Sequence, residues 1–514
     1  MIKHLFAVAG VCAALTGAAQ KKADPQIFGR SITTTDLKNH LSVIASAEME
    51  GRDTPSPGLE KAADYITAHF EKLGLKPGNN GSFRQTYQLS KDSLAVLKLT
   101  INGMHFEGDK DIAPIWTDDD KIDLNYKEYA LAGYGIVDQN RDDYAGLDVK
   151  GKLVVIFAGS PKGFTPSSPG RAASTTLGSK ISNALAKGAG AILIATKEIP
   201  PRAKVKVRYK PTWEREADGE KATPTFYISA HVVEKVSGHG FEEIEEALNN
   251  GQTSPGINEG AIALNYLLQK DRATASNVLG VIEGTDKKDE YLFITAHYDH
   301  VGKDAEGNIY YGADDDGSGT VSVLEMAEAF ALAKKAGKGP RRTIVFMTVS
   351  GEEKGLWGSE YYSENPVFPM DKTTADLNID MIGRIDTERM SADTLNYVYV
   401  IGHDKLSTDL PVINEGMNNK YTRLVLDYKF DDPNDKERIY YRSDHYNFAR
   451  KGVPILFFYD GMLKADYHKP TDTIDKINFP LMAKRAQMIF YTAWEMANRN
   501  EMLKRDLKLP EQAH

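Results

Sequence analysis

The chain has 514 residues, of which 41% are hydrophobic and 26% are charged. This composition is that of an ordinary folded protein and excludes a disordered or fibrous chain. The length exceeds what one hydrophobic core usually organises, so we expect two or more domains. The 63 basic and 72 acidic residues give a formal net charge of -9, which excludes a general attraction to nucleic acid or anionic lipid.

The first 19 residues have the pattern of a secretory signal peptide. Lys3 is followed by an apolar run from residue 5 to residue 15 and by small residues that suit cleavage after Ala19. A lipoprotein anchor at Cys12 is the alternative, but the bulky Val11 before it favours simple secretion. We therefore expect an exported protein of the periplasm or the medium, without cysteine once it is processed. No later apolar stretch approaches the roughly 20 residues of a membrane helix, so we expect no stable membrane insertion.

Helical spacing of apolar residues extends from residue 37 to residue 75, where Gly74 and Pro77 end the pattern. After residue 102 the sequence changes to short strands and turns, through about residue 253. From residue 261 onward, strand and helix patterns alternate. The predicted strands cover 277–284, 290–297, 342–350, 375–383 and 453–460, and the predicted helices cover 320–335, 356–363 and 479–505. This alternation predicts an α/β fold with a mixed, largely parallel sheet sandwiched by helices.

Polar residues follow these strands at their carboxyl ends, where open α/β sheets place their active crevices. A single such histidine or acid would be read as a structural or solvated residue. Here they recur at successive strand ends: His297 with Asp299, Glu352 with Glu353, Asp380, and His468, together with the loop GADDDGSG at 312–319. Imidazole and carboxylate are good zinc donors, and a pair of metals needs a short bridging carboxylate such as aspartate. The set therefore predicts a site for two divalent cations.

Five motifs, in this order, resemble the secreted di-zinc aminopeptidases of metallopeptidase family twenty-eight, whose relatives include glutamate carboxypeptidase, glutaminyl cyclase and the transferrin receptor. The motifs are HYDH (297–300), GADDDGSG (312–319), SGEEKGLWGSEYY (350–362), NIDMIG (378–383) and YHKPTDT (467–473). The resemblance implies a zinc exopeptidase fold in two parts, 24–110 and 257–506, before a polar tail at 507–514. Residues 111–256 resemble an inserted, smaller and β-rich α/β protease-associated domain.

The resemblance also implies roles for single residues. His297 and Asp380 would hold one Zn2+, Glu353 and His468 would hold the other, and Asp315 would bridge them. Cobalt or manganese would suit the same donors. The peptide bond between Asp315 and Asp316 is expected to be cis.

Three further residues would assist the chemistry. Asp299 would accept a hydrogen bond from the His297 ring nitrogen that faces away from the metal. Glu352 would be the general base that takes a proton from the attacking water and passes it to the leaving amine. Tyr440 would donate a hydrogen bond to the oxyanion, although Tyr441 beside it leaves this assignment open and either ring would also suit packed aromatic surface.

The predicted function is hydrolysis of the N-terminal peptide bond of peptide substrates through a water bridged by two zinc ions. A carboxypeptidase on the same scaffold is the alternative; it would need basic residues for a free carboxylate, and Arg384 and Arg442 are candidates. A glutaminyl cyclase would use one zinc, whereas every position for two is filled here. A receptor-like binding protein would be expected to lack ligands or the base, and none is missing. The sequence indicates neither the oligomeric state nor the side-chain specificity.

Overall fold

The computed structural model describes residues 24–108, 110–116, 119–168, 173–200, 203, 207–213, 223–250, 256–390, 393 and 395–509. The predicted signal peptide lies outside the described residues, as does the tail beyond residue 509. The chain divides into two compact units. We call Met1–Tyr87 with Ala275–His514 the first unit, and Gln88–Thr274 the second unit.

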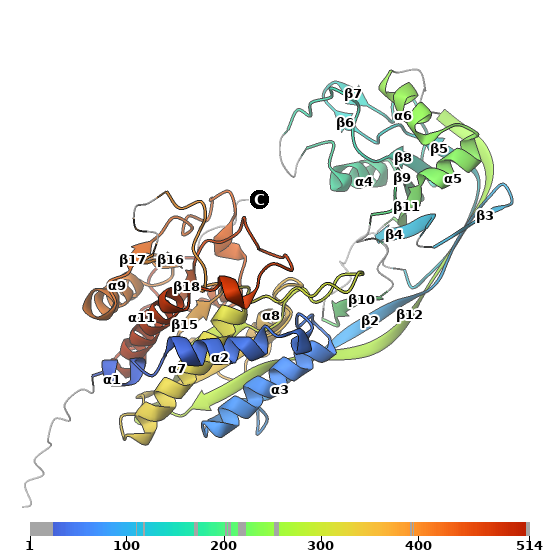
Figure 1. Cartoon of the computed structure of the whole chain (residues 1–514). Coiled ribbons are helices and arrows are strands. Elements are labelled where there is room, and N and C mark those ends of the chain that lie inside the picture. The colour runs from blue at the N-terminus through green and yellow to red at the C-terminus, as the bar shows by residue number, and fades with distance from the viewer. Residues whose placement is uncertain are drawn as a thin grey trace, which may run out of the picture. The chain divides into compact units, whose positions relative to one another are not determined.

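A mixed sheet forms the middle layer of the first unit (Figure 1). Its order is β17 (Val425–Asp427), β16 (Tyr397–Ile401), β18 (Ile455–Tyr459), β15 (Thr373–Ile379), β13 (Lys287–His297), β14 (Arg342–Val349) and the end of β12 (Gly256–Ile282), which also pairs with β1 (Lys76–Pro77). The neighbours β13–β14, β13–β15, β15–β18 and β16–β17 are parallel, whereas β12–β14 and β16–β18 are antiparallel. The predicted fold class is thus confirmed.

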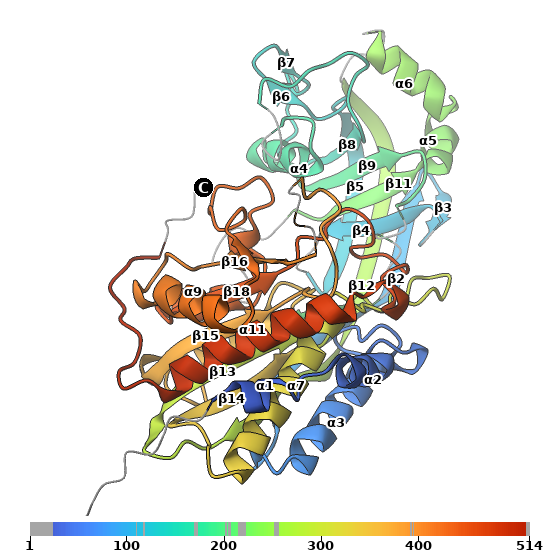
Figure 2. The same cartoon turned by 60° about the vertical axis from the view of Figure 1, so that its left-hand side comes forward.

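Helices cover both faces of this sheet (Figures 1 and 2). On one face, Phe330 of α7 packs against Phe346 of β14, while the next residue along β14, Met347, belongs to a cluster with Phe448 on the other face. This alternation explains why the strands read as nearly continuous apolar runs. The helices are α1 (Gln26–Gly29), α2 (Thr34–Ile44), α3 (Pro57–Lys72), α7 (Gly317–Lys335), α8 (Trp357–Glu364), α9 (Asp409–Tyr421), α10 (His445–Arg450) and α11 (Phe479–Asn498), with short 3-10 turns at Ala47–Met49, Met370–Lys372, Ile439–Tyr441 and Ile474–Lys476.

The last helix is shorter than predicted. The apolar pattern predicted a helix over 479–505, but α11 ends at Asn498. The guanidinium of Arg342, which is fully buried, donates to the carbonyl oxygens of Met496 at 2.9 Å and Arg499 at 2.7 Å. These bonds satisfy carbonyls that a continuing helix would have used. The chain then leaves the helix, and Leu503 packs separately into the core.

The second unit has its own hydrophobic core, and its strands follow β12 in the sheet order. Its strand order is β12, β5 (Lys121–Leu131), β8 (Leu153–Phe157), β9 (Ala191–Thr196), β11 (Thr225–Ser229) and β4 (Ile112–Trp116). Helix α4 (Leu177–Ala186) packs on one face, and α5 (Ala230–Ser237) and α6 (Phe241–Asn249) pack on the other (Figure 1). The remaining strands are β2 (Arg84–Ile101), β3 (Met104–Glu107), β6 (Val137–Asp138), β7 (Arg141–Asp142) and β10 (Val207–Pro211).

The boundaries of the second unit differ from the predicted insertion at 111–256. The compact unit begins at Gln88 and ends at Thr274, so it is longer at both ends. The reason is that each boundary lies within a long strand. β2 continues through the first boundary and β12 through the second, without a turn. Nothing local in the sequence marks these two points.

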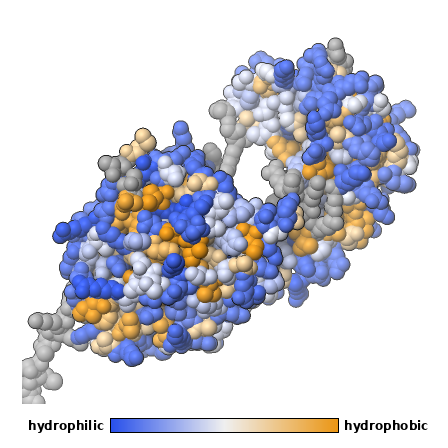
Figure 3. Space-filling model, viewed as in Figure 1, coloured by the Kyte–Doolittle hydropathy of each residue, from blue (hydrophilic) through white to orange (hydrophobic). Residues whose placement is uncertain are grey.

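The surface agrees with the composition. The face shown in Figure 3 is mostly hydrophilic, with several hydrophobic patches. Among the helices of the described residues, none combines the length and the apolar character that crossing a bilayer requires.

Candidate metal centre

The predicted site residues meet at one edge of the sheet in the first unit. Strand β13 ends at His297, β15 ends one residue before Asp380, and β14 ends three residues before Glu352. Because these strands are parallel neighbours, their carboxyl ends lie side by side. The GADDDGSG loop before α7 and the segment after β18 that carries His468 reach the same edge.

Asp315 lies at the centre of the cluster. Its Oδ1 is 3.3 Å from Nε2 of His297, and its Oδ2 is 3.1 Å from Nε2 of His468. On one side, Nε2 of His297 is also 3.6 Å from Oδ1 of Asp380. On the other side, Nε2 of His468 is 2.8 Å from Oε2 of Glu353. The structure therefore brings all five predicted metal ligands together and places Asp315 between two halves.

Several buried polar atoms in this cluster make no hydrogen bond. They are His297 Nε2, Asp315 Oδ2, Glu353 Oε1 and His468 Nε2. Leaving buried polar atoms unpaired is costly, and native proteins seldom do so without a reason. Divalent cations would supply the missing partners, and imidazole nitrogens with carboxylate oxygens are a typical zinc donor set. The residues thus fit the metals that the sequence predicts.

The three consecutive aspartates have different partners. Asp316 caps α7 by accepting from Gly319 N at 2.8 Å, and it also accepts from the backbone N–H groups of His297 and Met381. Asp314 accepts from Gly383 N at 2.8 Å. Burial raises the pKa of both Asp314 and Asp316. The peptide bond between Asp315 and Asp316 is cis, which confirms that expectation. Two aspartates fasten the loop to the backbone, and the middle one faces the cluster.

Two supporting residues were missed by the sequence analysis. Asp472 accepts from the backbone N–H groups of Asp314 at 3.0 Å and Asp315 at 3.1 Å, so it holds the loop from behind. The fully buried Arg52 donates to the carbonyl oxygens of Tyr298 and Gly312, both at 2.8 Å. Asp472 stands within the YHKPTDT motif, which is a signal that was available. Arg52 lies in no motif that we recognised.

Asp299 is placed beside His297 but contacts it through a different atom from the one predicted. Nδ1 of His297 is 3.1 Å from the backbone carbonyl oxygen of Asp299 and 3.7 Å from its carboxylate. The carboxylate instead accepts from Glu352 N at 3.2 Å and from the Thr54 hydroxyl at 3.1 Å. Burial raises the pKa of Asp299 to about 6. Asp299 therefore orients both the histidine and the segment that carries Glu352.

A pocket opens beside one half of the cluster. Its walls include Asp315, Glu352 and Asp380, and the other walls are Met381, Ile439, Arg442, Phe457, Tyr459, Leu463 and Tyr467. Oε2 of Glu352 is 3.9 Å from Nε2 of His297. Burial raises the pKa of Glu352 well above its ordinary value.

The structure does not bring Tyr440 to this pocket. Its side chain is fully buried, its ring packs against Tyr441 and His445, and its hydroxyl makes no hydrogen bond. The physical reason is the 3-10 turn Ile439–Tyr441, in which residues three apart share a face. Ile439 and Arg442 line the pocket, so Tyr440 between them points into the core. The tyrosines that do line the pocket are Tyr459 and Tyr467.

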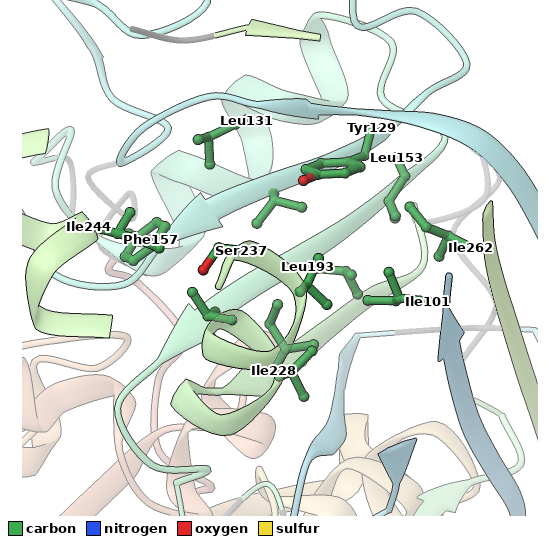
Figure 4. A pocket seen from close by; sticks show the side chains of 14 residues that line it. Ile101, Tyr129, Leu131, Leu153, Phe157, Leu193, Ile228, Ser237, Ile244 and Ile262 are labelled. Atoms are coloured by element: carbon green, nitrogen blue, oxygen red, sulfur yellow. The ribbon is translucent and has the colours of Figure 1, made fainter. Parts of the chain in front are cut away.

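Two other places in the described residues carry less chemistry. His403, Asp404 and Asp431 lie close enough to hold an ion, but Nζ of Lys405 is already 2.9 Å from Oδ2 of Asp431 and supplies the positive charge. The second unit contains a cavity of about 90 Å³ between its sheet and α5 (Figure 4). Its lining is almost wholly apolar and includes no cluster of titratable groups.

The fold is similar to those of two aminopeptidases of solved structure. An aminopeptidase from Aneurinibacillus sp. strain AM-1 aligns with a TM-score of 0.56 at 18% identity, over 95% of this chain and 100% of that one. BSAP, a zinc aminopeptidase from Bacillus subtilis, aligns with a TM-score of 0.55 at 20% identity, over 93% of this chain and 99% of that one. At these identities the likeness establishes the fold.

Sequence comparison shows a similarity to peptidases. Residues 277–493 match peptidase family M28. A "Probable leucine aminopeptidase" from Trichophyton verrucosum is 29% identical over 265 residues, which are 50% of this chain and 67% of that protein. A "Probable glutamate carboxypeptidase LAMP1" from Arabidopsis thaliana is 34% identical, but over only 26% of this chain and 19% of that protein. Residues 277–493, which contain the candidate metal ligands, are therefore similar to peptidase family M28.

Asp472 offers a test of how the loop is held. We expect Asp472→Asn to weaken zinc binding by about 10- to 100-fold, because such outer partners orient metal ligands and an amide replaces an acceptor of two backbone N–H groups. The measurement is competition with a zinc-binding dye. The exposed Asp475 in the same segment provides the control, Asp475→Asn, which should bind zinc as the unaltered protein does. Equal affinity in all three proteins would contradict this role.

Proposed function

We propose that the protein is an aminopeptidase that hydrolyses the N-terminal peptide bond of peptides with the aid of two zinc ions. The ligands would be His297, Asp315, Glu353, Asp380 and His468. The observation that carries this proposal is the buried cluster around Asp315, which opens beside Glu352 onto a pocket. The metals, when bound, would polarise the scissile carbonyl and lower the pKa of the attacking water.

Glu352 is placed to move the proton. It lies next to Glu353 in the chain, yet it faces the pocket, while Glu353 faces His468. Its backbone N–H donates to Asp299, which holds the segment in position. The Glu352 carboxylate would accept a proton from the attacking water and deliver it to the leaving amine nitrogen, so that no covalent enzyme intermediate is needed.

The pocket walls suggest how the substrate is held. Met381, Ile439 and Phe457 present apolar surface on which a substrate side chain would be desolvated. Carboxylates of Glu352 and Asp380 at the pocket edge would attract a free α-ammonium group. The names of the fungal and bacterial relatives support the same activity. We further propose export to the periplasm or medium, because the first 19 residues have the signal-peptide pattern.

Hydrolysis of a leucyl anilide tests this proposal. We expect the purified protein to release the amine, to lose this activity after dialysis against a chelator, and to regain it when Zn2+ is added back. The same anilide with its amino group acetylated serves as the control, and it should not be cleaved. Activity that survives complete metal removal would show that the proposed mechanism is wrong.

Glu352→Gln tests the base. The substitution keeps the size of the side chain but removes its capacity to accept a proton, so we expect turnover to fall by about 10²- to 10⁴-fold while metal content is unchanged. Turnover comes from the anilide assay, and metal content from elemental analysis. Glu360→Gln, on α8 in the same motif, is the matched control and should retain activity. Near-normal turnover of Glu352→Gln would remove this residue from the role.

A carboxypeptidase remains the second candidate because Arg442 lines the pocket. Its guanidinium is 3.3 Å from the Tyr467 hydroxyl, and its nearest carboxylate, Glu437, is 3.9 Å away. Arg442 therefore remains available for a substrate carboxylate. Arg384, the other candidate, is committed to Asp466 at 2.8 Å.

Two substrates separate the candidates. Under the aminopeptidase proposal, an N-acetylated dipeptide that ends in glutamate is not hydrolysed, whereas the leucyl anilide is. Under the alternative, the blocked dipeptide is cleaved, and Arg442→Met lowers kcat/KM for it by about 10-fold or more, because a charge-assisted hydrogen bond is lost. Product analysis by mass spectrometry distinguishes these outcomes.

A further inference from the structure

His300 lies within the cluster but is not one of the five predicted metal ligands. Its side chain is fully buried. Its Nδ1 is 2.8 Å from Oε1 of Glu353 and 3.7 Å from Oδ2 of Asp315. One ligand atom from each of His300, Asp315 and Glu353 lies within 4.8 Å of the others. Despite this closeness, neither ring nitrogen of His300 makes a hydrogen bond.

The GADDDGSG loop leaves room for this ring. A Cβ atom on Gly312 would lie 2.5 Å from Cγ of His300, a distance that no side chain could accept. Gly312 also has φ +55, in the left-handed region that favours glycine. The first residue of the motif therefore lets the imidazole approach the aspartate loop closely.

Glu353 lies between two histidines. Its Oε1 faces Nδ1 of His300, and its Oε2 faces Nε2 of His468, each at 2.8 Å. The two rings have centroids 5.6 Å apart and are nearly perpendicular. A buried imidazole with no hydrogen bond, directed at a carboxylate of a metal cluster, has the environment of a ligand.

We propose that His300 is an additional metal ligand, and that the two metal subsites of this protein are therefore unequal. This inference rests on the two-metal site of the proposed function. The subsite of Glu353 and His468 would have four protein donors, namely His300, Glu353, His468 and the bridging Asp315. The subsite of His297 and Asp380 would have three. Zinc sites with four protein ligands are closed, whereas catalytic sites keep a position open.

The pocket lies beside the half of the cluster that would have three protein donors. Asp315, Glu352 and Asp380 line the pocket, but His300, Glu353 and His468 are not among its walls. The Glu352 carboxylate is near His297, in the three-donor half. The three-donor half would thus be the one that leaves room for a water beside Glu352, and the four-donor half would hold its zinc more tightly.

Zinc titration of the chelator-treated full chain tests the inference. We expect the unaltered protein to bind two Zn2+ in two phases of different affinity. His300→Ala and His300→Asn should each weaken the tighter phase by about 100-fold or more, a larger loss than for a residue that only orients a ligand. Asparagine is the informative change, because its amide nitrogen occupies nearly the position of Nδ1 and keeps a hydrogen-bond donor there.

His403→Gln is the matched control, since His403 belongs to the other cluster that resembles a cation site. It should bind two Zn2+ as the unaltered protein does. Normal affinity in His300→Asn, with or without a loss in His300→Ala, would overturn the proposal and leave His300 a hydrogen-bonding or packing residue. An unaltered protein that binds no Zn2+ would instead overturn the proposed function itself.

A second measurement needs no variant and holds even if the substitutions disturb folding. In the cobalt-substituted protein, each coordinated histidine gives a paramagnetically shifted ring N–H signal in the proton NMR spectrum. Three such signals support the assignment of His297, His300 and His468 as ligands. Two signals would overturn it.

Discussion

The burial of Asp315 between His297 and His468 is the constraint on which the site depends. Asp315 as a whole residue is only 3% exposed, and Glu352, Glu353 and Asp380 lie at the same edge of the sheet. Burial alone would raise the pKa of Asp315, but the surrounding histidines hold it well below its usual value. Charge of this density is stable only where positive charge balances it, and divalent cations would provide that balance. Folding and catalysis therefore both depend on positive charge within this cluster.

Backbone N–H groups and outer side chains stabilise the other buried aspartates and the loop. Asp314, Asp316 and Asp472 accept hydrogen bonds from the backbone, so none of them needs a metal. Arg52 fastens the loop from the opposite side through carbonyl oxygens. Such partners limit the freedom of the ligands and reduce the reorganisation that metal binding and reaction would require.

The two halves of the cluster face different surroundings. The half with His297 and Asp380 adjoins Glu352 and the pocket, whereas in the other half His300 lies beside Glu353. An arrangement of this kind separates holding a metal from exposing one to substrate. The pocket has both apolar walls and Arg442, so it suits either a substrate side chain or a substrate carboxylate. Tests with substrates, and not the set of metal ligands, therefore distinguish an aminopeptidase from a carboxypeptidase.

The sequence alone determined the α/β class, the parallel strands and the residues that meet at their carboxyl ends, because side-chain periodicity and strand-end motifs are local properties. Even the start of α7 was placed within a few residues. What only the tertiary structure decided depends on segments distant in the chain. Packing chose which face of the turn Ile439–Tyr441 meets the pocket, and so buried Tyr440. Arg342 ended α11, and β2 and β12 ran uninterrupted through the unit boundaries. Long-range contacts of this kind leave no local periodicity from which they can be read.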